Sequence, residues 1–399
     1  MKVLFIGGIF DESHYPEIIH KSKKGVEFAA NTFQKKLLAG LKVNSVSPMV
    51  ISAPFIGAYP SDYSESVFKG FEHKDNSGYL YCHFLNVFGI RNLSRRGNVK
   101  RAVDSFIVDN DEEKCIIVYS PHTPFLQAAN YAKKKDSRIK ICLVVPDLPQ
   151  YMNLNQNIPW YYSLLKKWDI KVFMRESKTV DSFVLLTSQM KEQLEVGSRP
   201  YIVVEGIASE KPCEQVAHPC DSTKTIVYAG KLNYSFGVMT LIEAFSRIQD
   251  SNVRLIICGA GEAEKEIEIA SREDSRIEYK GLVSPSQALS YMKSATVLVN
   301  PRQNNSDYTR YSFPSKIMDY LSTGKPVVSY YLDGMPEYYS SFLYCPEDNT
   351  PDALCHQLEL ALDESSISAA IRIKKYCEYY DTNISEVAVG RRIINLLLD

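Results

Sequence analysis

The residues from 310 to 328 combine side chains that can bind a phosphate and a sugar. Pro314 and Gly324 suit the first turn and the C-terminal end of a short helix, and a proline soon afterwards prevents its continuation. Lys316 and Asp319 are three residues apart, so they would share one face near the positive end of that helix. An ammonium group beside a helix N-terminus attracts anions, and a carboxylate accepts hydrogen bonds from sugar hydroxyls. We therefore expect a pocket for a sugar-linked phosphate, although an ordinary helix–strand unit of a parallel sheet has the same features.

Short apolar runs rich in β-branched residues alternate with helical patterns along the chain. Continuous apolar strands between helices are typical of parallel sheets that are covered on both faces. The runs form two sets, at residues 3–6, 116–119, 141–145, 183–186 and 201–204, and at residues 226–228, 253–258, 277–279, 296–299 and 326–330. Because a chain of 399 residues is also too long for one hydrophobic core, we expect two doubly wound α/β domains.

The two sets of strands give the predicted domain boundaries. Residues 208–223 are polar, contain two prolines and lack periodicity, so they are expected to link a first domain, 1–207, to a second, 224–375. Residues 376–399 belong to a helical pattern that we expect to pack back toward the N-terminal domain. Residues 48–76 are rich in Ser, Tyr, Gly and Pro, which predicts a long loop that shapes a binding site.

The composition is that of a soluble globular protein with no strong charge bias. A net charge of -1 argues against a general nucleic-acid-binding protein. The nine cysteines are scattered without a CxxC pair, and Cys213 and Cys220 flank His218 at a spacing that matches no common zinc site. We therefore expect a reduced, cytoplasmic setting and no metal. The N-terminal apolar run is too short for a signal peptide, and no stretch reaches the roughly 20 apolar residues of a membrane span.

Five motifs in the second half of the chain resemble the donor domain of GT-B retaining glycosyltransferases of family 4. In chain order they are Tyr228-Ala-Gly-Lys-Leu-Asn, Leu255-Ile-Ile-Cys-Gly-Ala-Gly-Glu, Arg276-Ile-Glu-Tyr-Lys-Gly, Ala295-Thr-Val-Leu-Val-Asn-Pro, and Phe313-Pro-Ser-Lys with the following Gly324-Lys-Pro-Val-Val. In the first half the resemblance is weaker and covers Gly7-Gly8, Leu185-Leu-Thr-Ser and Val204-Glu-Gly. The sequence Phe-Pro-Ser-Lys is similar to the motif of a subgroup of this family that is common in bacterial surface-polysaccharide synthesis.

The resemblance implies an α/β, GT-B fold with two Rossmann-like doubly wound parallel-sheet domains facing across a cleft. It implies a nucleotide-sugar donor on the C-terminal domain, a glycan acceptor on the N-terminal domain, and retention of the anomeric configuration without a metal or other cofactor. The motifs follow predicted strands, which agrees with the general rule that ligands bind at the carboxyl ends of the strands in open α/β sheets.

The resemblance also implies which residues hold the donor. Lys231 stands where the family has a phosphate-binding Arg, and Asp319 matches the second acid of a paired-glutamate motif that is associated with the ribose. The other expected donor-binding residues are Gly7, Gly8, Gly230, Gly259, Gly261, Arg310, Ser315 and Lys316. The Gly-Ala-Gly turn lacks the third glycine of a dinucleotide fingerprint, so a nicotinamide cofactor is not expected.

Three positions depart from the family's pattern. Phe236 stands where the family has a second basic residue, so one cation is missing and Lys316 or Arg310 would replace it. Tyr311 stands where the first acid of the pair is expected, which makes it a candidate catalytic residue and leaves open how the transferred sugar is held. Pro146 stands where many relatives have an active-site His.

Two further candidate catalytic residues lie in the first half. His122 and Asp147 each follow a predicted parallel strand and could face the cleft, although an isolated His is more often structural. Asp109-Asn-Asp111 has the form of a DxD motif, but it lies in an acidic run before a strand and is interpreted as a solvated loop.

Aromatic and basic residues between 159 and 171 favour one hypothesis about the acceptor. Residues 91–101 and 133–135 add further cations. Interfacial helices have such a composition, so the protein could attach to the inner face of an anionic membrane and use a lipid-linked acceptor. A core helix with solvated lysines explains the pattern equally well.

Two functions from different classes remain. The first is a retaining glycosyltransferase that builds a bacterial surface polysaccharide. The alternative is a non-catalytic GT-B-like partner subunit that binds nucleotide or glycan. The departures at Phe236, Tyr311 and Pro146 favour the alternative, whereas Lys231 and the Lys316–Asp319 pair favour the transferase.

Overall fold

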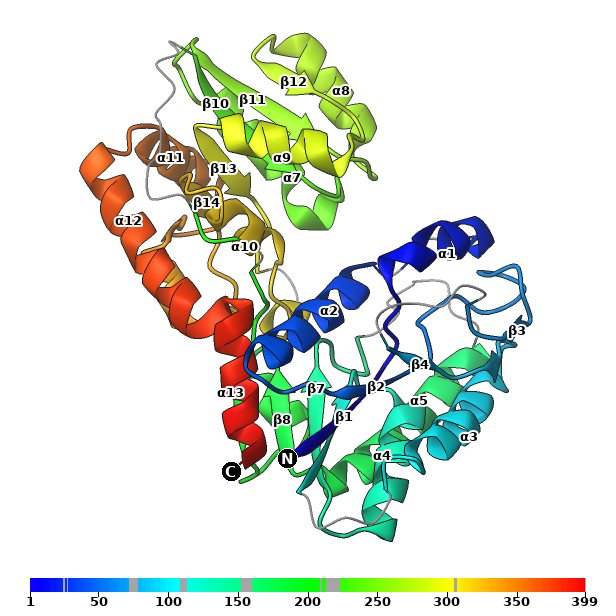
Figure 1. The fold of residues 1–399 in the computed structure, drawn as a ribbon. Coiled ribbons are helices and arrows are strands. Elements are labelled where there is room, and N and C mark those ends of the chain that lie inside the picture. The colour runs from blue at the N-terminus through cyan, green and yellow to red at the C-terminus, as the bar shows by residue number, and fades with distance from the viewer. Residues whose placement is uncertain are drawn as a thin grey trace. The chain divides into compact units, whose positions relative to one another are not determined.

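The described residues of the chain form two compact units. The structure is a computed structural model that describes residues 1–23, 26, 28–71, 78–107, 113–151, 160–208, 210–212, 223–304 and 307–398, with the side chains of residues 160–162 excepted. One unit consists of Met1–Ile207 with Glu386–Asp399, and the other of Ala208–Ser385 (Figure 1). The expected α/β class with two parallel sheets is confirmed.

The first unit is built on a parallel sheet with the strand order β4-β2-β1-β6-β7-β8-β9 in the described part of the chain. The strands are β1 (Lys2–Gly7), β2 (Met49–Ser52), β4 (Leu80–Tyr81), β6 (Lys114–Tyr119), β7 (Lys140–Val145), β8 (Ser182–Leu185) and β9 (Tyr201–Val203). Short antiparallel strands β3 (Val67–Phe68) and β5 (Phe84–Leu85) pair beside the sheet. The helices are α1 (Tyr15–Lys21), α2 (Phe28–Val43), α3 (Arg91–Val103), α4 (Thr123–Lys135), α5 (Trp160–Glu176), α6 (Met190–Gln193) and α13 (Glu386–Leu398).

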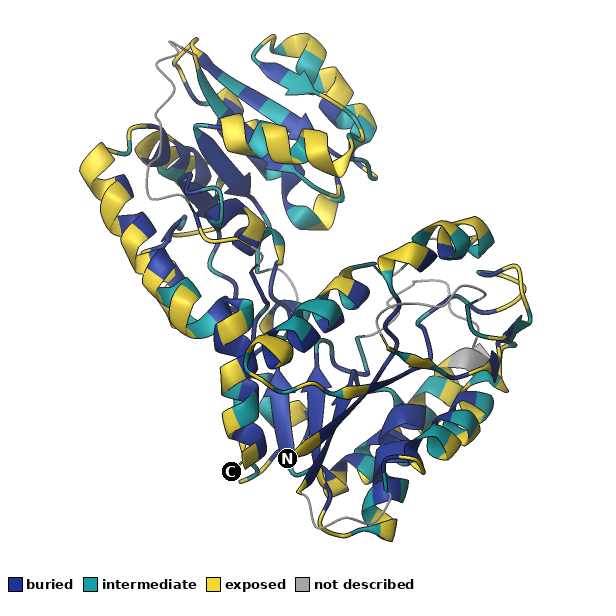
Figure 2. Cartoon of the chain, viewed as in Figure 1, coloured by how far each residue is buried: buried dark blue, intermediate teal, exposed yellow. Residues whose placement is uncertain are grey.

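Apolar side chains on both faces explain why the central strands of this sheet are buried (Figure 2). Leu37 and Leu41 of α2 and Ile393 of α13 pack against one face, in a core that includes Phe5 and Ile117. Every residue of β6 is buried, as expected for a parallel strand that is covered from both sides. The packing of these helices on the sheet thus fixes the positions of the strand ends.

Two glycines allow α2 and α13 to cross at close range. A Cβ atom on Gly40 would overlap the carbonyl oxygen of Glu386, and one on Gly390 would overlap the carbonyl oxygen of Gly40. The side-chain amide of Asn44 also donates to the carbonyl of Val387 at 2.9 Å. The C-terminal helix is therefore an integral part of the first unit.

The second unit contains a smaller parallel sheet with the order β12-β11-β10-β13-β14-β15. Its strands are β10 (Lys224–Ala229), β11 (Val253–Cys258), β12 (Ile277–Tyr279), β13 (Val297–Asn300), β14 (Val327–Ser329) and β15 (Leu343–Tyr344). Its helices are α7 (Val238–Ser246), α8 (Glu264–Glu273), α9 (Pro285–Ser294), α10 (Lys316–Leu321), α11 (Pro351–Leu362) and α12 (Ser366–Tyr379). In Figure 1, α9 lies across β10 and β11, and α7 packs against α11.

Two expectations about local structure were wrong. Residues 49–52, which were expected to belong to a long loop, form β2, because the apolar run Met-Val-Ile pairs with β1 inside the sheet. Pro314 does not occupy the first helical turn, since α10 begins only at Lys316. Gly324 does adopt a positive φ of 74° just after α10, a conformation that L side chains rarely adopt.

The chain passes from one unit to the other at two points, between Ile207 and Ala208 and between Ser385 and Glu386. Most of the predicted linker, 208–223, lies outside the described residues, as do Cys213, Cys220 and the Asp109-Asn-Asp111 segment. The second passage follows α12 and a single π-helical turn, Tyr380–Ile384. In the described part of the chain, no helix is long and apolar enough to cross a membrane.

Candidate functional site

Each sheet has a topological switch point, where the chain reverses the direction in which it adds strands. In the second unit this point lies between β10 and β13, which are neighbours in the sheet but far apart in the sequence. Crevices at the carboxyl ends of strands beside a switch point are the usual ligand sites of such sheets. Gly230 and Lys231 follow β10, and Arg302 follows β13, so all three lie at this edge.

Lys316 reaches this edge from α10. Its Nζ atom lies 3.4 Å from the hydroxyl oxygen of Tyr228 and 4.7 Å from the centroid of the Tyr228 ring. Tyr320, on the same helix, is bonded to the backbone of Ala229, with its hydroxyl accepting from the amide at 3.0 Å. These contacts fix α10 against the last turn of β10.

Glycines that follow β10 and β11 let neighbouring groups lie very close to the backbone. A Cβ atom on Gly230 would overlap the Nζ atom of Lys316, so the ammonium group occupies the space that any other residue would fill. Gly259 has a φ of 141°, and a Cβ there would overlap the carbonyl oxygen of Gly230. The amide of Gly261 donates to Glu264 at 2.7 Å, which fixes the second turn.

Positive charge is concentrated at the end of β10. Burial and, to a smaller extent, the nearby cations Lys231 and Arg302 together lower the pKa of Lys316 to about 8. The Lys231 side chain is exposed, whereas Lys316 and Arg302 are half-buried. Three basic groups from three separate segments therefore face one region, which is suited to a polyanion such as a diphosphate.

Arg302 was not among the residues predicted from the sequence. Its guanidinium carbon lies 5.6 Å from the ring centroid of Phe236, the residue that stands in place of the family's second basic residue. It lies at the same distance from the Tyr308 ring and donates to the Ser312 hydroxyl at 3.2 Å. Burial lowers its pKa. A cation three residues after the predicted strand 296–299 was the signal that could have found it.

The remaining residues of the 310–328 stretch do not all meet at Lys316. Arg310 forms an ion pair with Asp333 at 3.3 Å, in the loop after β14. Ser315 precedes α10 and its side chain makes no capping bond, while Asp319 is exposed on α10. Tyr311 is half-buried at the end of the 3-10 turn Asp307–Tyr311.

The first unit has its own switch point, between β1 and β6. Gly7 and Gly8 end β1, and a Cβ atom on Gly8 would overlap the ring of Phe55. His122 precedes α4 at the end of β6, with its ring centroid 5.7 Å from that of Phe55. The structure thus brings both Gly8 and His122 against the ring of Phe55. Asp147 is half-buried beyond the end of the neighbouring strand β7.

The electrostatic environment of His122 is unusual. Burial lowers the pKa of His122 well below its ordinary value, and the positive charges of Arg95 and Arg91 lower it further. Its Nδ1 atom is buried and has no hydrogen-bond partner among the described residues, although the residue as a whole is partly exposed. His122 is therefore neutral at pH 7 in the ligand-free protein.

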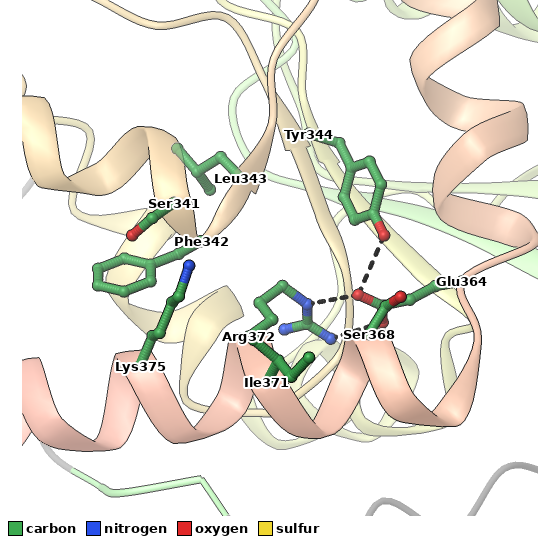
Figure 3. A pocket seen from close by; sticks show the side chains of 9 residues that line it. All are labelled: Ser341, Phe342, Leu343, Tyr344, Glu364, Ser368, Ile371, Arg372 and Lys375. Atoms are coloured by element: carbon green, nitrogen blue, oxygen red, sulfur yellow. Dashed lines mark hydrogen bonds and ion pairs between the residues drawn. The ribbon is translucent and has the colours of Figure 1, made fainter.

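A separate open pocket lies between α12 and the segment before β15 (Figure 3). Arg372 and Glu364 form a buried ion pair there, with 2.8 Å between Nε and Oε1. Arg372 also donates to the carbonyl oxygens of Gly324 at 3.0 Å and Lys325 at 3.2 Å. None of the residues that line this pocket belongs to the predicted donor site, but Arg372 braces the turn between α10 and β14.

Residues 223–364, which make up most of the second unit, match the family model described as glycosyl transferases group 1. No curated protein matches the chain.

Solved structures with the same fold cover the whole of this chain. The apo form of the lipopolysaccharide outer core galactosyltransferase WaaB is 16% identical, with a TM-score of 0.63, and the match covers 100% of this chain and 99% of WaaB. HepE of Anabaena in complex with UDP is 12% identical, with a TM-score of 0.62 and 100% of both chains covered. WaaG, a glycosyltransferase involved in lipopolysaccharide biosynthesis, is 12% identical, with a TM-score of 0.57 and 99% of both chains covered. At these identities the likeness shows the fold, and the expected GT-B fold with two Rossmann-like units is confirmed.

Proposed function

We propose that this protein is a retaining glycosyltransferase that moves a sugar from a nucleotide-sugar donor to a glycan acceptor. The observation that carries the proposal is the convergence of Lys231, Arg302 and Lys316 at the switch point of a glycosyltransferase group 1 domain. In the ligand-free protein these cations repel one another, and the low pKa of Lys316 reflects burial first and that repulsion second. A nucleoside diphosphate would relieve it.

The chemistry asked of these residues is stabilisation of a leaving group. Breaking the bond between the sugar and the diphosphate places negative charge on the phosphate oxygens. Fixed cations in a partly buried site stabilise that charge without reorganisation, so no metal is required in the proposed reaction. Gly230 lets the Lys316 ammonium group lie against the backbone at the end of β10, where the phosphates are proposed to bind. Asp319 is proposed to bind the ribose, and Tyr311 to contact the transferred sugar.

The first unit is proposed to bind the acceptor. His122 and Asp147 lie at the carboxyl ends of adjacent strands, β6 and β7, where an acceptor hydroxyl could reach them. Because its lowered pKa keeps His122 neutral, one imidazole nitrogen carries a lone pair that is proposed to accept a hydrogen bond from such a hydroxyl. The neighbours WaaB and WaaG, whose names refer to lipopolysaccharide, support a role in a bacterial surface polysaccharide.

Exposed apolar residues on α5 support peripheral attachment to a membrane. Leu164, Leu165 and Trp168 are 58%, 50% and 64% exposed, and Lys167 and Lys171 are exposed beside them. Aromatic and aliphatic residues flanked by lysines are typical of helices that lie on anionic lipid. This pattern favours a lipid-linked acceptor at the inner face of the membrane over a helix that is wholly part of the core.

The donor site is tested by binding and turnover of nucleotide sugars. Thermal shift and hydrolysis are measured with UDP-, GDP- and dTDP-sugars for the wild type, Lys316→Gln and the control Lys293→Gln, which removes an exposed lysine from α9. We expect one nucleotide class to stabilise the wild type and Lys293→Gln, with affinity reduced about tenfold or more in Lys316→Gln. If no nucleotide binds to the wild type, the assignment of the donor site is wrong. Binding without turnover, even with a lipid-linked acceptor, would favour the partner-subunit alternative.

Membrane attachment is tested by co-sedimentation with liposomes that contain anionic lipid. The wild type should bind at low salt and dissociate as salt is raised, because the lysine contribution is screened. Trp168→Ser with Leu164→Ser should bind more weakly, whereas Ile269→Ser, at an exposed apolar residue on α8, should bind as the wild type does. No binding of the wild type at low salt would contradict attachment.

A further inference from the structure

We propose that the first unit contains a binding site for an oxyanion, a phosphate or a carboxylate, between α3 and the beginning of α4. The residues that would hold the anion are Arg91, Arg95 and His122. The inference rests on the proposed function in one respect, because it takes the anion to be part of the glycosyl acceptor.

Arg95 is the observation that points to an anion. Its side chain is only 2% exposed, yet its guanidinium forms no ion pair with a carboxylate in the described part of the chain. One Nη2–H donates to the carbonyl oxygen of Pro54 at 2.6 Å, and the guanidinium carbon lies 4.2 Å from the Phe84 ring centroid. The Nε atom is buried and has no partner among the described residues. A donor of a permanently charged group is therefore left unsatisfied.

Such an arrangement is unfavourable in the ligand-free protein. Removing a charge from water costs several kcal/mol when no counter-charge compensates it. Arg91 adds to the cost, since it lies one helical turn from Arg95 and carries the same charge. Burial and then the charge of Arg91 lower the pKa of Arg95. A guanidinium nevertheless stays protonated at physiological pH, so the site needs negative charge from elsewhere.

His122 lies in the same region as the two arginines. Both arginines act on its pKa, so their charges are near the imidazole. The chain between Pro54 and Ile56 joins the three residues: Pro54 accepts from Arg95, Ile56 accepts from Arg91 at 3.2 Å, and the Phe55 ring packs against His122. His122 Nδ1, like Arg95 Nε, is a buried nitrogen without a partner in the described part of the chain.

The position of the cluster is that of a ligand site. The 54–56 segment follows β2, Gly8 follows β1 and His122 follows β6, so the cluster lies at the carboxyl ends of three adjacent strands beside the switch point. The positive end of the 13-residue helix α4 also begins here. Arginine pairs bind phosphate and carboxylate through parallel charge-assisted hydrogen bonds, and a neutral sugar would leave the buried charge uncompensated.

The test uses inorganic phosphate and acetate as probes, in a background that weakens anion binding at the other unit. Calorimetric titrations at constant ionic strength are made on the full chain carrying Lys231→Gln and Lys316→Gln. Arg91→Gln and Arg95→Gln are compared with Arg96→Gln, which removes a charge from the half-buried Arg96 on the same helix. We expect phosphate, acetate or both to bind, with affinity reduced at least about tenfold by Arg91→Gln or Arg95→Gln and unchanged by Arg96→Gln.

Arg91 is half-buried, so its variant tests the site even if Arg95→Gln does not fold. Tighter binding of phosphate would indicate a phosphorylated acceptor, and comparable binding of acetate would indicate an acidic sugar. Equal affinity in all variants, or no binding of either probe, would overturn the inference. If the wild-type chain binds no nucleotide, the proposed function is wrong instead. Failure of the anion site and failure of the proposed function therefore give different results.

Discussion

The hydroxyl of Tyr228 bonds both to Lys316, 88 positions later in the chain, and to the turn at the end of its own strand. It accepts from Lys316 Nζ at 3.4 Å and donates to the carbonyl oxygen of Lys231 at 2.7 Å. Burial raises the pKa of Tyr228, so the phenol stays protonated and keeps donating to that carbonyl. One hydroxyl thus holds the ammonium of α10 against the turn after β10, where the other cations meet.

Gly230→Ala should displace Lys316 without unfolding the protein. The new Cβ would overlap the end of a flexible side chain rather than backbone, so the lysine can move aside at little cost in stability. We expect nucleotide affinity to fall about tenfold, as one charge-assisted bond is lost, with little change in Tm. In a Lys316→Ala background the same substitution should have no further effect, because its target is gone. Additive losses in the double variant would contradict this.

Nucleotide affinity should depend on pH through Lys316. The ligand-free protein loses the Lys316 proton above about pH 8, and the uncharged amine binds a diphosphate less well. We therefore expect Kd to be flat below pH 8 and to rise above it, and Lys316→Arg to remove that rise, since Arg stays charged. Titration calorimetry in buffers of different ionisation enthalpy should show proton uptake on binding near pH 8.

The stability of the ligand-free protein should rise with pH, whereas nucleotide affinity should fall. The folded-state pKa of Lys316, about 8, lies below its ordinary value of 10.5, so the unfolded chain binds more protons between these values. The free energy of unfolding should therefore rise with pH in that window relative to Lys316→Met, which lacks the titrating group. A difference that falls with pH would mean that the Lys316 pKa is not lowered.

Arg302 should act in place of the cation that is missing at Phe236. Arg302→Gln is expected to lower kcat about a hundredfold, the size of effect seen when one fixed donor to a developing anion is removed. The matched control, Arg272→Gln, removes an exposed arginine from α8 and should leave kcat unchanged. Adding Phe236→Lys to Arg302→Gln should restore part of the activity. No change in kcat for Arg302→Gln would exclude the role.

Two glycines in helices of the first unit should respond oppositely to substitution by Ala. Gly390→Ala would drive a Cβ into the backbone of Gly40 and should lower the free energy of unfolding by about 1–3 kcal/mol. Gly97→Ala, inside α3 with open space around it, should raise it by about 0.5–1 kcal/mol. Tryptophan fluorescence during urea unfolding checks both, since the chain's two Trp residues, Trp160 and Trp168, lie on α5 of this unit.

The strand pattern and the order of the motifs were sufficient to predict the GT-B fold and to place the residues of the proposed donor site at one edge of a sheet. Apolar runs between helical segments require parallel sheets with both faces covered, and a motif that follows such a strand must lie at the carboxyl edge. Gly230, Lys231 and Lys316 could therefore be placed together from the sequence. Strand β2 was missed because its apolar run is only a few residues long and is surrounded by turn-forming residues.

Tertiary structure decided which cations share the site. Arg310 and Arg302 lie eight positions apart, and only Arg310 belonged to the motif, yet Arg310 pairs with Asp333 while Arg302 lies over Phe236. The sequence also could not show that Arg95 is buried without a carboxylate partner among the described residues, because burial and pairing depend on segments distant in the chain. Sequence determines the strands and therefore the edge at which side chains gather. The partner of each charge is decided by the three-dimensional approach of separate loops, which spacing along the chain does not encode.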